Sequence, residues 1–408
     1  MDLRPKKIFN YNLEVLRGCA ALVVVLSHIV SHGRVFNPNI TLGVLKLMRP
    51  PAHLAVLIFF VLSGYVIGIN HKEPMAGGDI SKYFRKRFLR IYPIYFICTA
   101  AAFLLALPRF SWGEVISNFT LTQNILYPRF QENVPAWSLN FEVLYYILFV
   151  PVSLFAIRSG GVFILSMVIA LAGYYLPVNP LLPGYALGFC FWVSGLWIAR
   201  NCSEFAEKVR LLPTMFYFLA IENILLYNGW VTRILSLVKV PSMMKGKFLA
   251  QEIIQLNDAI LLPFCFIIII CLSGITMKYK KVVFLLLQLI PLAILAIAAR
   301  HGHLPAPLKV SAALLVVAGI LYFVPLNETL FVKAGLWLGS VSYGIYICHF
   351  PILVLFGRLP FAVGSKVGYG IEVIIYLALT LLAGWWLEKK VHPFLKGWLE
   401  RTLMRSSK

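Results

Sequence analysis

The feature that most constrains this chain is a series of apolar runs, each close to the length that a helix needs to cross a bilayer. A bilayer-spanning helix takes about 20 largely apolar residues, within a range of roughly 17–25. Because a backbone in lipid must satisfy its hydrogen bonds internally, such runs predict helices. Twelve runs meet this requirement, at residues 15–31, 52–69, 88–107, 136–157, 161–177, 182–199, 211–229, 258–276, 282–299, 308–325, 336–356 and 369–387.

Composition supports a membrane protein and excludes a soluble one. Hydrophobic residues make up 60% of the 408 residues and charged residues 13%, whereas soluble domains have roughly 45–50% and about 25%. We therefore predict an all-α, polytopic transmembrane helix bundle of 10–12 spans. It is expected to be a single integral-membrane domain over residues 1–408.

The net charge of +21 predicts an orientation in the membrane rather than a nucleic-acid partner. Lys and Arg lie in short clusters between apolar runs, not interleaved with polar surface as in a nucleic-acid-binding domain. With the N-terminus in the cytoplasm, 23 of the 37 basic residues are cytoplasmic, 13 lie in outer loops and one lies inside the first span. The positive-inside rule therefore places both termini in the cytoplasm, with a short basic tail over residues 389–408.

The sequence indicates neither a metal site nor an ATP-driven pump. The 7 cysteines include no CxxC pair, and His301 and His303 have no third ligand beside them. The phosphate-binding loop GxxxxGK, the nucleophile elbow GxSxG and the zinc motif HExxH do not occur. We therefore expect no metal cofactor.

Polar residues inside the first span form the strongest functional signal. Arg17 and His28 are eleven residues apart, which places them on one helix face about 16 Å apart along the axis. Glu14 falls on the same face. An ionisable residue inside a span costs about 2.5–3.5 kcal/mol on insertion scales and is a candidate for function. The alternative is that Arg17 extends to the interface paired with Glu14, and that His28 is a packing residue.

Two further spans carry candidates at a depth comparable with that of His28. Glu142 lies near the outer end of the fourth span, where an unpaired carboxylate would be protonated or would need a partner. Ser342, Tyr346 and His349 follow one face of the eleventh run, with His349 in its outer half. The alternatives are an interfacial aromatic belt with Glu142 facing water, and a packing stripe of serine and tyrosine.

A basic and aromatic segment precedes the third span. Arg85, Arg87 and Arg90 lie within residues 84–93, at a membrane entrance. Guanidinium groups match phosphate oxygens bidentately, so the segment is a candidate site for a phosphate-bearing cosubstrate. The alternative is an anchor on anionic membrane lipid.

Together these residues resemble the acyltransferase-3 family of integral-membrane O-acyltransferases. Five motifs match in order: the opening helix 12–28 with its Arg and His, F-F-V-L-S-G-Y at 59–65, R-x-x-R-I-Y-P at 87–93, W-S-L-x-x-E at 137–142 and G-x-x-S-Y-x-x-Y-x-x-H at 339–349. Two positions depart from the family pattern. The family commonly has Asp at the position of Glu14. Near the C-terminus the family usually has a Glu closely followed by a Pro, whereas Glu388 and Pro393 are five residues apart.

The resemblance implies transfer of an acyl group, usually acetyl, from cytoplasmic acyl-CoA to a hydroxyl of an exported glycan or lipid-linked sugar at the bacterial inner membrane. It implies that His28 is the general base or handles the acyl group in a relay, with a pKa suited to proton transfer at neutral pH. Glu142 is expected to orient His28, and His349 to complete the catalytic set.

The cytoplasmic side is expected to bind the donor. Arg17, Arg85, Arg87 and Arg90 are the residues expected to bind acyl-CoA, with Arg17 at its thioester end. The acyl group could be acetyl or succinyl. The competing interpretation is a secondary transporter or flippase, which would show discontinuous helices and related half-structures. We see no internal repeat in the sequence.

Overall fold

The computed structural model describes residues 10–36, 50–107, 110–176, 178–179, 181–202, 209–225, 254–300, 305–324, 326–359 and 365–405. These residues form helices and contain no named β-strand, which confirms the predicted all-α class. His301 and His303 lie outside the described residues.

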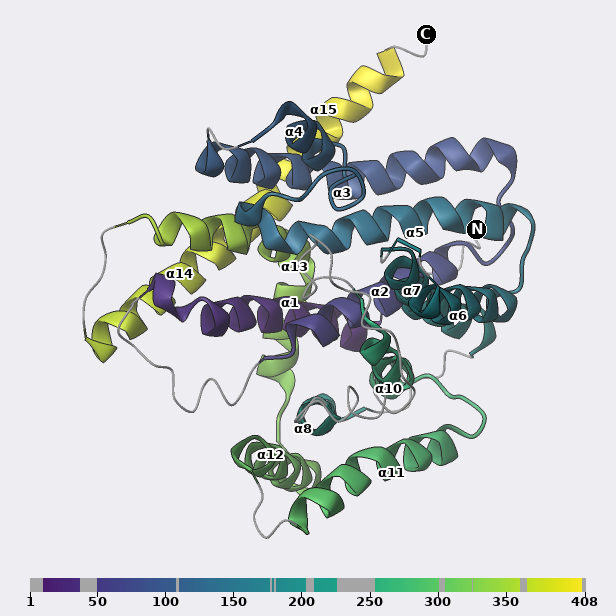
Figure 1. Cartoon of the computed structure of the whole chain (residues 1–408), viewed down its shortest axis with the longest axis vertical. Coiled ribbons are helices and arrows are strands. Elements are labelled where there is room, and N and C mark those ends of the chain that lie inside the picture. The colour runs from purple at the N-terminus through teal and green to yellow at the C-terminus, as the bar shows by residue number, and fades with distance from the viewer. Residues whose placement is uncertain are drawn as a thin grey trace, which may run out of the picture.

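Figure 1 shows the helices in their order along the chain. Their bounds are α1 Tyr11–Ser31, α2 Ala52–Asn70, α3 Gly77–Ala106, α4 Trp112–Phe119, α5 Trp137–Leu154, α6 Ser159–Tyr175, α7 Leu181–Asn201, α8 Leu211–Leu225, α10 Leu261–Ser273, α11 Lys280–Ala299, α12 Ala306–Phe323, α13 Thr329–Phe356, α14 Lys366–Trp386 and α15 His392–Arg405. A 3-10 segment, Gln131–Ala136, precedes α5, and a π-helical turn, Leu387–Val391, joins α14 to α15.

Each of the twelve predicted runs corresponds to a helix. Ten helical stretches are long and apolar enough to cross a membrane, and α6 and α8 are shorter apolar helices. The described helices therefore confirm the predicted range of 10–12 spans. The cytoplasmic placement of the termini stays a prediction.

Two predicted boundaries differ from the structure. The third span was expected to begin at residue 88, but α3 begins at Gly77. The basic segment of residues 84–93 is therefore helical and continuous with the span. Arginine is a good helix former, so the composition of the segment is compatible with a helix. The tail predicted over 389–408 is also helical as far as Arg405.

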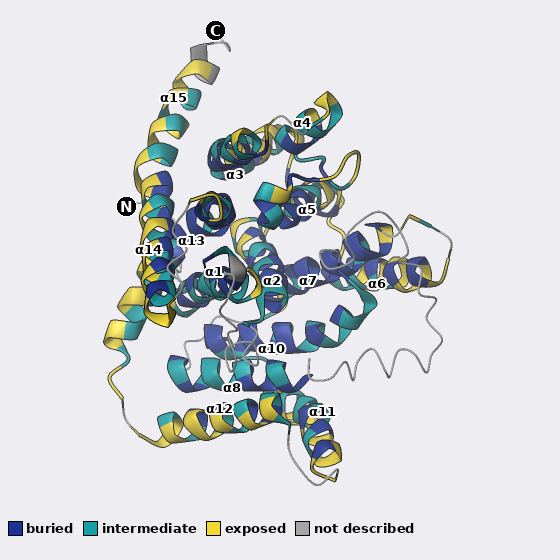
Figure 2. Cartoon of the chain, turned by 60° about the vertical axis from the view of Figure 1, so that its left-hand side comes forward, coloured by how far each residue is buried: buried dark blue, intermediate teal, exposed yellow. Residues whose placement is uncertain are grey.

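The outer surface of the bundle is apolar, as a lipid-facing surface requires. Figure 2 shows exposed residues along α11, α12 and α14. Many of these are large hydrophobic side chains, including Leu289, Phe323 and Ile374, which are 61%, 84% and 66% exposed. Soluble monomers rarely expose apolar patches of such extent. The exposed helices therefore support an integral membrane protein.

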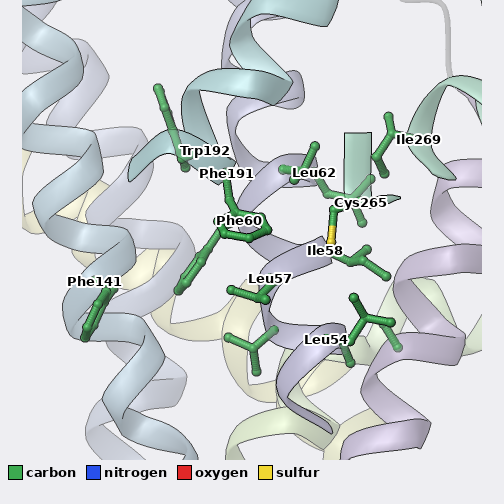
Figure 3. Packing of buried hydrophobic residues seen from close by; sticks show 14 of the residues in the cluster. Leu54, Leu57, Ile58, Phe60, Leu62, Phe141, Phe191, Trp192, Cys265 and Ile269 are labelled. Carbon is green, nitrogen blue, oxygen red and sulfur yellow. The ribbon is translucent and has the colours of Figure 1, made fainter. Parts of the chain in front are cut away.

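The core is built around α2. Figure 3 shows Leu57 and Phe60 of α2 close to Phe191 of α7 and Cys265 of α10. Phe60 also packs against Phe141 of α5, with ring centroids 6.2 Å apart. The central position of α2 holds α5 and α7 in fixed places beside it, and α5 carries part of the candidate site.

Glycines set the contact between α2 and α7. A Cβ on Gly64 would lie 1.8 Å from the carbonyl oxygen of Trp192, and one on Gly195 would lie 1.9 Å from that of Val61. Real Cβ atoms do not approach backbone atoms so closely, so only glycine fits at either position. Small residues at helix crossings are the usual way in which membrane helices pack without a hydrophobic driving force.

We expect Gly195→Ala to destabilise the protein by about 1–3 kcal/mol, because the new methyl group must push α2 and α7 apart. The measurement is thermal unfolding of the purified protein in detergent. Gly319→Ala is the matched control, since a Cβ on Gly319 meets nothing within 4 Å. Equal melting temperatures for the two variants would contradict the importance of this crossing.

Candidate active site

Glycines also bring α1 and α13 into close contact. A Cβ on Gly18 would lie 2.5 Å from the backbone nitrogen of Gly339, and one on Gly339 would lie 2.3 Å from the carbonyl oxygen of Glu14. The two backbones are therefore close enough for polar side chains of one helix to reach the other directly. Two such contacts form, one around Arg17 and one around His28.

Arg17 is held by three partners. Its Nη2 donates to Glu14 Oε1 at 2.6 Å and to the Gly339 carbonyl at 2.8 Å, and its Nε donates to Ser342 Oγ at 3.1 Å. The Glu14 carboxylate balances the partly buried positive charge of Arg17. Arg17 is thereby fixed in orientation and linked to α13.

His28 and His349 form a direct pair. His28 Nδ1 lies 3.0 Å from His349 Nε2, and His349 is fully buried. His349 Nδ1 lies 2.7 Å from the carbonyl oxygen of Tyr346, which can only accept a hydrogen bond. In the neutral ring Nδ1 therefore carries the proton, and Nε2 accepts from His28 Nδ1–H. This assignment, which follows from the hydrogen-bond partners, leaves the lone pair of His28 on its Nε2.

A cavity of about 850 Å³ lies between α1, α2, α3, α5, α13 and α15. It is rich in cations, with seven Lys and Arg residues against two carboxylates. The cations are Arg17, Lys82, Arg85, Lys86, Arg87, Arg90 and Lys396, and the carboxylates are Glu142 and Glu400. All four arginines predicted to bind a donor thus line one cavity, which is suited to an anionic ligand.

The lining residues of α5 show how the cavity is oriented. Ser138, Glu142 and Tyr146 follow one another at four-residue intervals, which spans about 12 Å of helix. The Tyr146 ring lies 5.7 Å from the guanidinium of Arg87, at the cationic end. Ser138 Oγ lies 2.7 Å from the hydroxyl of Tyr346, at the other end. The histidine pair follows one helical turn beyond that tyrosine on α13.

Arg87 differs from the other arginines of the cavity. Its guanidinium lies near the rings of Tyr83 and Tyr146, 5.9 and 5.7 Å from their centroids. Its Nε is buried and has no hydrogen-bond partner within the described ranges. Burial, and then the positive charges of Arg87 and Lys86, lower the pKa of nearby His71. The field at this end of the cavity is therefore positive, and the Nε–H of Arg87 is available to donate a hydrogen bond to a ligand.

Arg90 is already neutralised by Glu388. Its Nη1 lies 3.0 and 2.8 Å from the two carboxylate oxygens of Glu388, and its guanidinium lies 5.3 Å from the Tyr343 ring. Glu388 lies in the π-helical turn Leu387–Val391. Such a turn takes up an extra residue in a helix, which fits the long spacing between Glu388 and Pro393. The sequence left the role of Glu388 open, and the structure places its carboxylate beside Arg90.

Glu142 does not contact His28 as predicted. Its Oε1 accepts hydrogen bonds from Ser63 Oγ at 2.9 Å and from the Tyr146 hydroxyl at 2.5 Å. The partner of His28 is instead His349. Glu142 lies on the cavity wall one helical turn from Ser138. Ser138 and Tyr346 mark the end of the cavity that is nearer to the histidine pair.

Several residues of the site were not assigned from the sequence. They are Ser63, Ser138, Tyr146 and Glu388, which contact one or another of the predicted residues or line the cavity. Helical spacing was the available signal for two of them, since Ser138 and Tyr146 lie four residues to either side of Glu142.

Comparison with known proteins agrees with this geometry. The chain is 26% identical over 250 residues to the "Putative acetyltransferase ORF330" of Acidianus two-tailed virus, an alignment that covers 55% of this chain and 70% of the viral protein. No solved structure matches the chain significantly.

A family profile described as an acyltransferase domain matches residues 10–389. The match includes both residues of the histidine pair and all the cavity-lining residues except His392, Lys396 and Glu400. Because it covers nearly the whole chain, the chain belongs to the acyltransferase-3 family and is an integral-membrane acyltransferase.

Proposed function

We propose that this acyltransferase moves an acyl group from cytoplasmic acyl-CoA to a hydroxyl of an exported glycan or lipid-linked sugar, at a bacterial inner membrane. The observation that carries the proposal is a cavity that is cationic at one end and is lined at the other by Tyr346, whose ring centroid lies 6.2 Å from that of His349 in the histidine pair. The name of the viral relative supports acetyl as the acyl group. Membership of an acyltransferase family favours this activity over the transporter or flippase alternative.

The cationic end of the cavity suits the phosphates of the donor. Arg87 has a buried Nε with no hydrogen-bond partner among the described residues, and exposed Lys82 and Lys86 lie beside it on α3. Guanidinium–phosphate hydrogen bonds are charge-assisted and hence stronger than neutral ones. Arg85 lines the same end. Arg90 is neutralised by the Glu388 carboxylate, so it would hold the cavity wall in place rather than bind phosphate.

The opposite end suits proton transfer. His28 Nε2 holds the free lone pair, so it can take the proton of an acceptor hydroxyl and return it to the sulfur of the leaving CoA. His349 fixes that tautomer through its contact with His28 Nδ1. The same nitrogen could carry the acyl group in a relay, so direct transfer and an acyl-enzyme step both use His28. Arg17 would hold the thioester end of the donor.

Replacement of His28 tests the proposal. We expect His28→Ala to lower acyl transfer by about 10²–10⁴-fold, because the general base is lost. The measurement is acylation of cell-surface glycans by mass spectrometry, in cells that contain equal membrane levels of each variant. His32→Gln is a matched control one turn further along the chain, since His32 contacts Ser31 and the His28 carbonyl, whereas His28 is the residue that contacts His349. Full acylation with His28→Ala would exclude it as the base.

The role of His349 can be separated from simple packing. We expect His349→Gln to retain at least about tenfold more activity than His349→Leu, because the side-chain carbonyl of Gln can still accept from His28 Nδ1–H. Both variants fill the buried space, so thermal unfolding serves as the check on folding. Equal activities in two folded variants would show that the hydrogen bond to His28 does not set its tautomer.

Loss of Arg87 is expected to weaken donor binding rather than chemistry. We expect Arg87→Ala to raise the KM for acetyl-CoA by about 10–100-fold, which corresponds to about 1.5–3 kcal/mol for a hydrogen bond to a charged group. The assay is CoA release from acetyl-CoA by the purified protein. Arg158→Ala, at the start of α6 and outside the cavity, is the control. An unchanged KM for Arg87→Ala would contradict donor binding and favour the alternative, in which this basic segment anchors the protein on anionic lipid.

A further inference from the structure

Two hydroxyl groups meet at the closed end of the cavity. Ser138 Oγ and the Tyr346 hydroxyl lie 2.7 Å apart, and each side chain is only 5% exposed. Both line the cavity. Both also lie within hydrogen-bond distance of the Pro135 carbonyl, at 3.2 Å for Ser138 and 3.1 Å for Tyr346. Each O–H donates to that carbonyl in the structure, so each has to turn away from it to donate to a ligand.

Their position is where the reacting carbonyl of the donor would arrive. A donor that enters from Arg87 passes Glu142 before it meets Ser138 and Tyr346. The Tyr346 ring centroid lies 6.2 Å from that of His349, which contacts the proposed base. A thioester group that reaches this end of the cavity therefore meets the two hydroxyls, with His349 behind the Tyr346 ring.

The remaining hydroxyls of the cavity wall have partners of their own. Ser63 donates to Glu142, and so does Tyr146. Ser342 donates to the carbonyl of Gly339. Acyl transfer from a thioester builds negative charge on the carbonyl oxygen, and hydrogen-bond donors placed at that oxygen are usually the largest single contribution to catalysis.

We propose that the hydroxyls of Ser138 and Tyr346 form the oxyanion hole of this acyltransferase, an inference that rests on the proposed transfer from acyl-CoA. His28 takes the proton of the acceptor hydroxyl as the acceptor oxygen bonds to the thioester carbon. The π pair of the carbonyl moves to its oxygen, which accepts hydrogen bonds from Ser138 and Tyr346. The pair then returns, the carbon–sulfur bond breaks, and His28 gives the proton to the CoA sulfur.

The test compares Tyr346→Phe and Ser138→Ala with the unmodified protein. We expect Tyr346→Phe to lower kcat by about 10²–10³-fold, and Ser138→Ala to lower it in the same direction, with KM for acetyl-CoA within about twofold. Hydrolysis of acetyl-CoA without an acceptor should fall by the same factor, since water attack forms the same oxyanion. The pH dependence of kcat should keep its shape, because His28 still transfers the proton.

Tyr174→Phe is the matched control. It removes another buried hydroxyl that donates to a backbone carbonyl, that of Ile254 at 2.8 Å, but one outside the cavity. We expect this variant to keep its kcat. A kcat for Tyr346→Phe within about threefold of the unmodified protein would overturn the oxyanion hole, as would a loss confined to KM or to acceptor-dependent turnover. An unmodified protein that releases no CoA from acetyl-CoA would instead contradict the proposed donor.

Discussion

The contact between α1 and α13 is the constraint on which the rest of the site depends. Without glycine at positions 18 and 339 the two backbones could not approach, and neither polar contact between them could form. The two contact positions on α1, Arg17 and His28, are eleven residues apart. Their partners on α13, Ser342 and His349, are seven residues apart. The unequal spacing fits two helices that cross at an angle and touch through polar groups on either side of the crossing. One packing feature thus fixes both an arginine and a histidine pair.

Charge pairing explains why similar arginines have different roles. A charge inside a bundle must be compensated, because desolvation of an unpaired ion is costly. Arg17 is compensated by Glu14 and Arg90 by Glu388. Arg87 instead lies near two aromatic rings, which attract a cation without using its hydrogen-bond donors. It is therefore the member of the set that is best prepared for a phosphate.

The sequence predicted what depends on local periodicity and missed what depends on helix crossings. Apolar runs located all twelve of the helices expected to span or enter the bilayer, because length and hydropathy act within one segment. The shared face of Glu14 and Arg17 also followed from spacing. The partner of His28 did not, since a depth estimate cannot distinguish Glu142 from His349 when both lie in outer halves of different spans. The packing of helices around each other decides that choice.

The distance between the two ends of the cavity bears on the chemistry of the donor. The cationic end at Tyr146 and the closed end at Ser138 are about 12 Å apart along α5. A donor must therefore carry its negative charge well away from its reactive carbonyl. In an acyl phosphate the two groups are adjacent, so one such molecule could not reach Arg87 and the histidine pair at once. In acyl-CoA a long uncharged arm separates the phosphates from the thioester, and the aromatic and aliphatic wall formed by Phe59, Leu62 and Leu139 offers that arm an apolar path. The same wall limits access of water to the carbonyl, which strengthens every hydrogen bond made to it there.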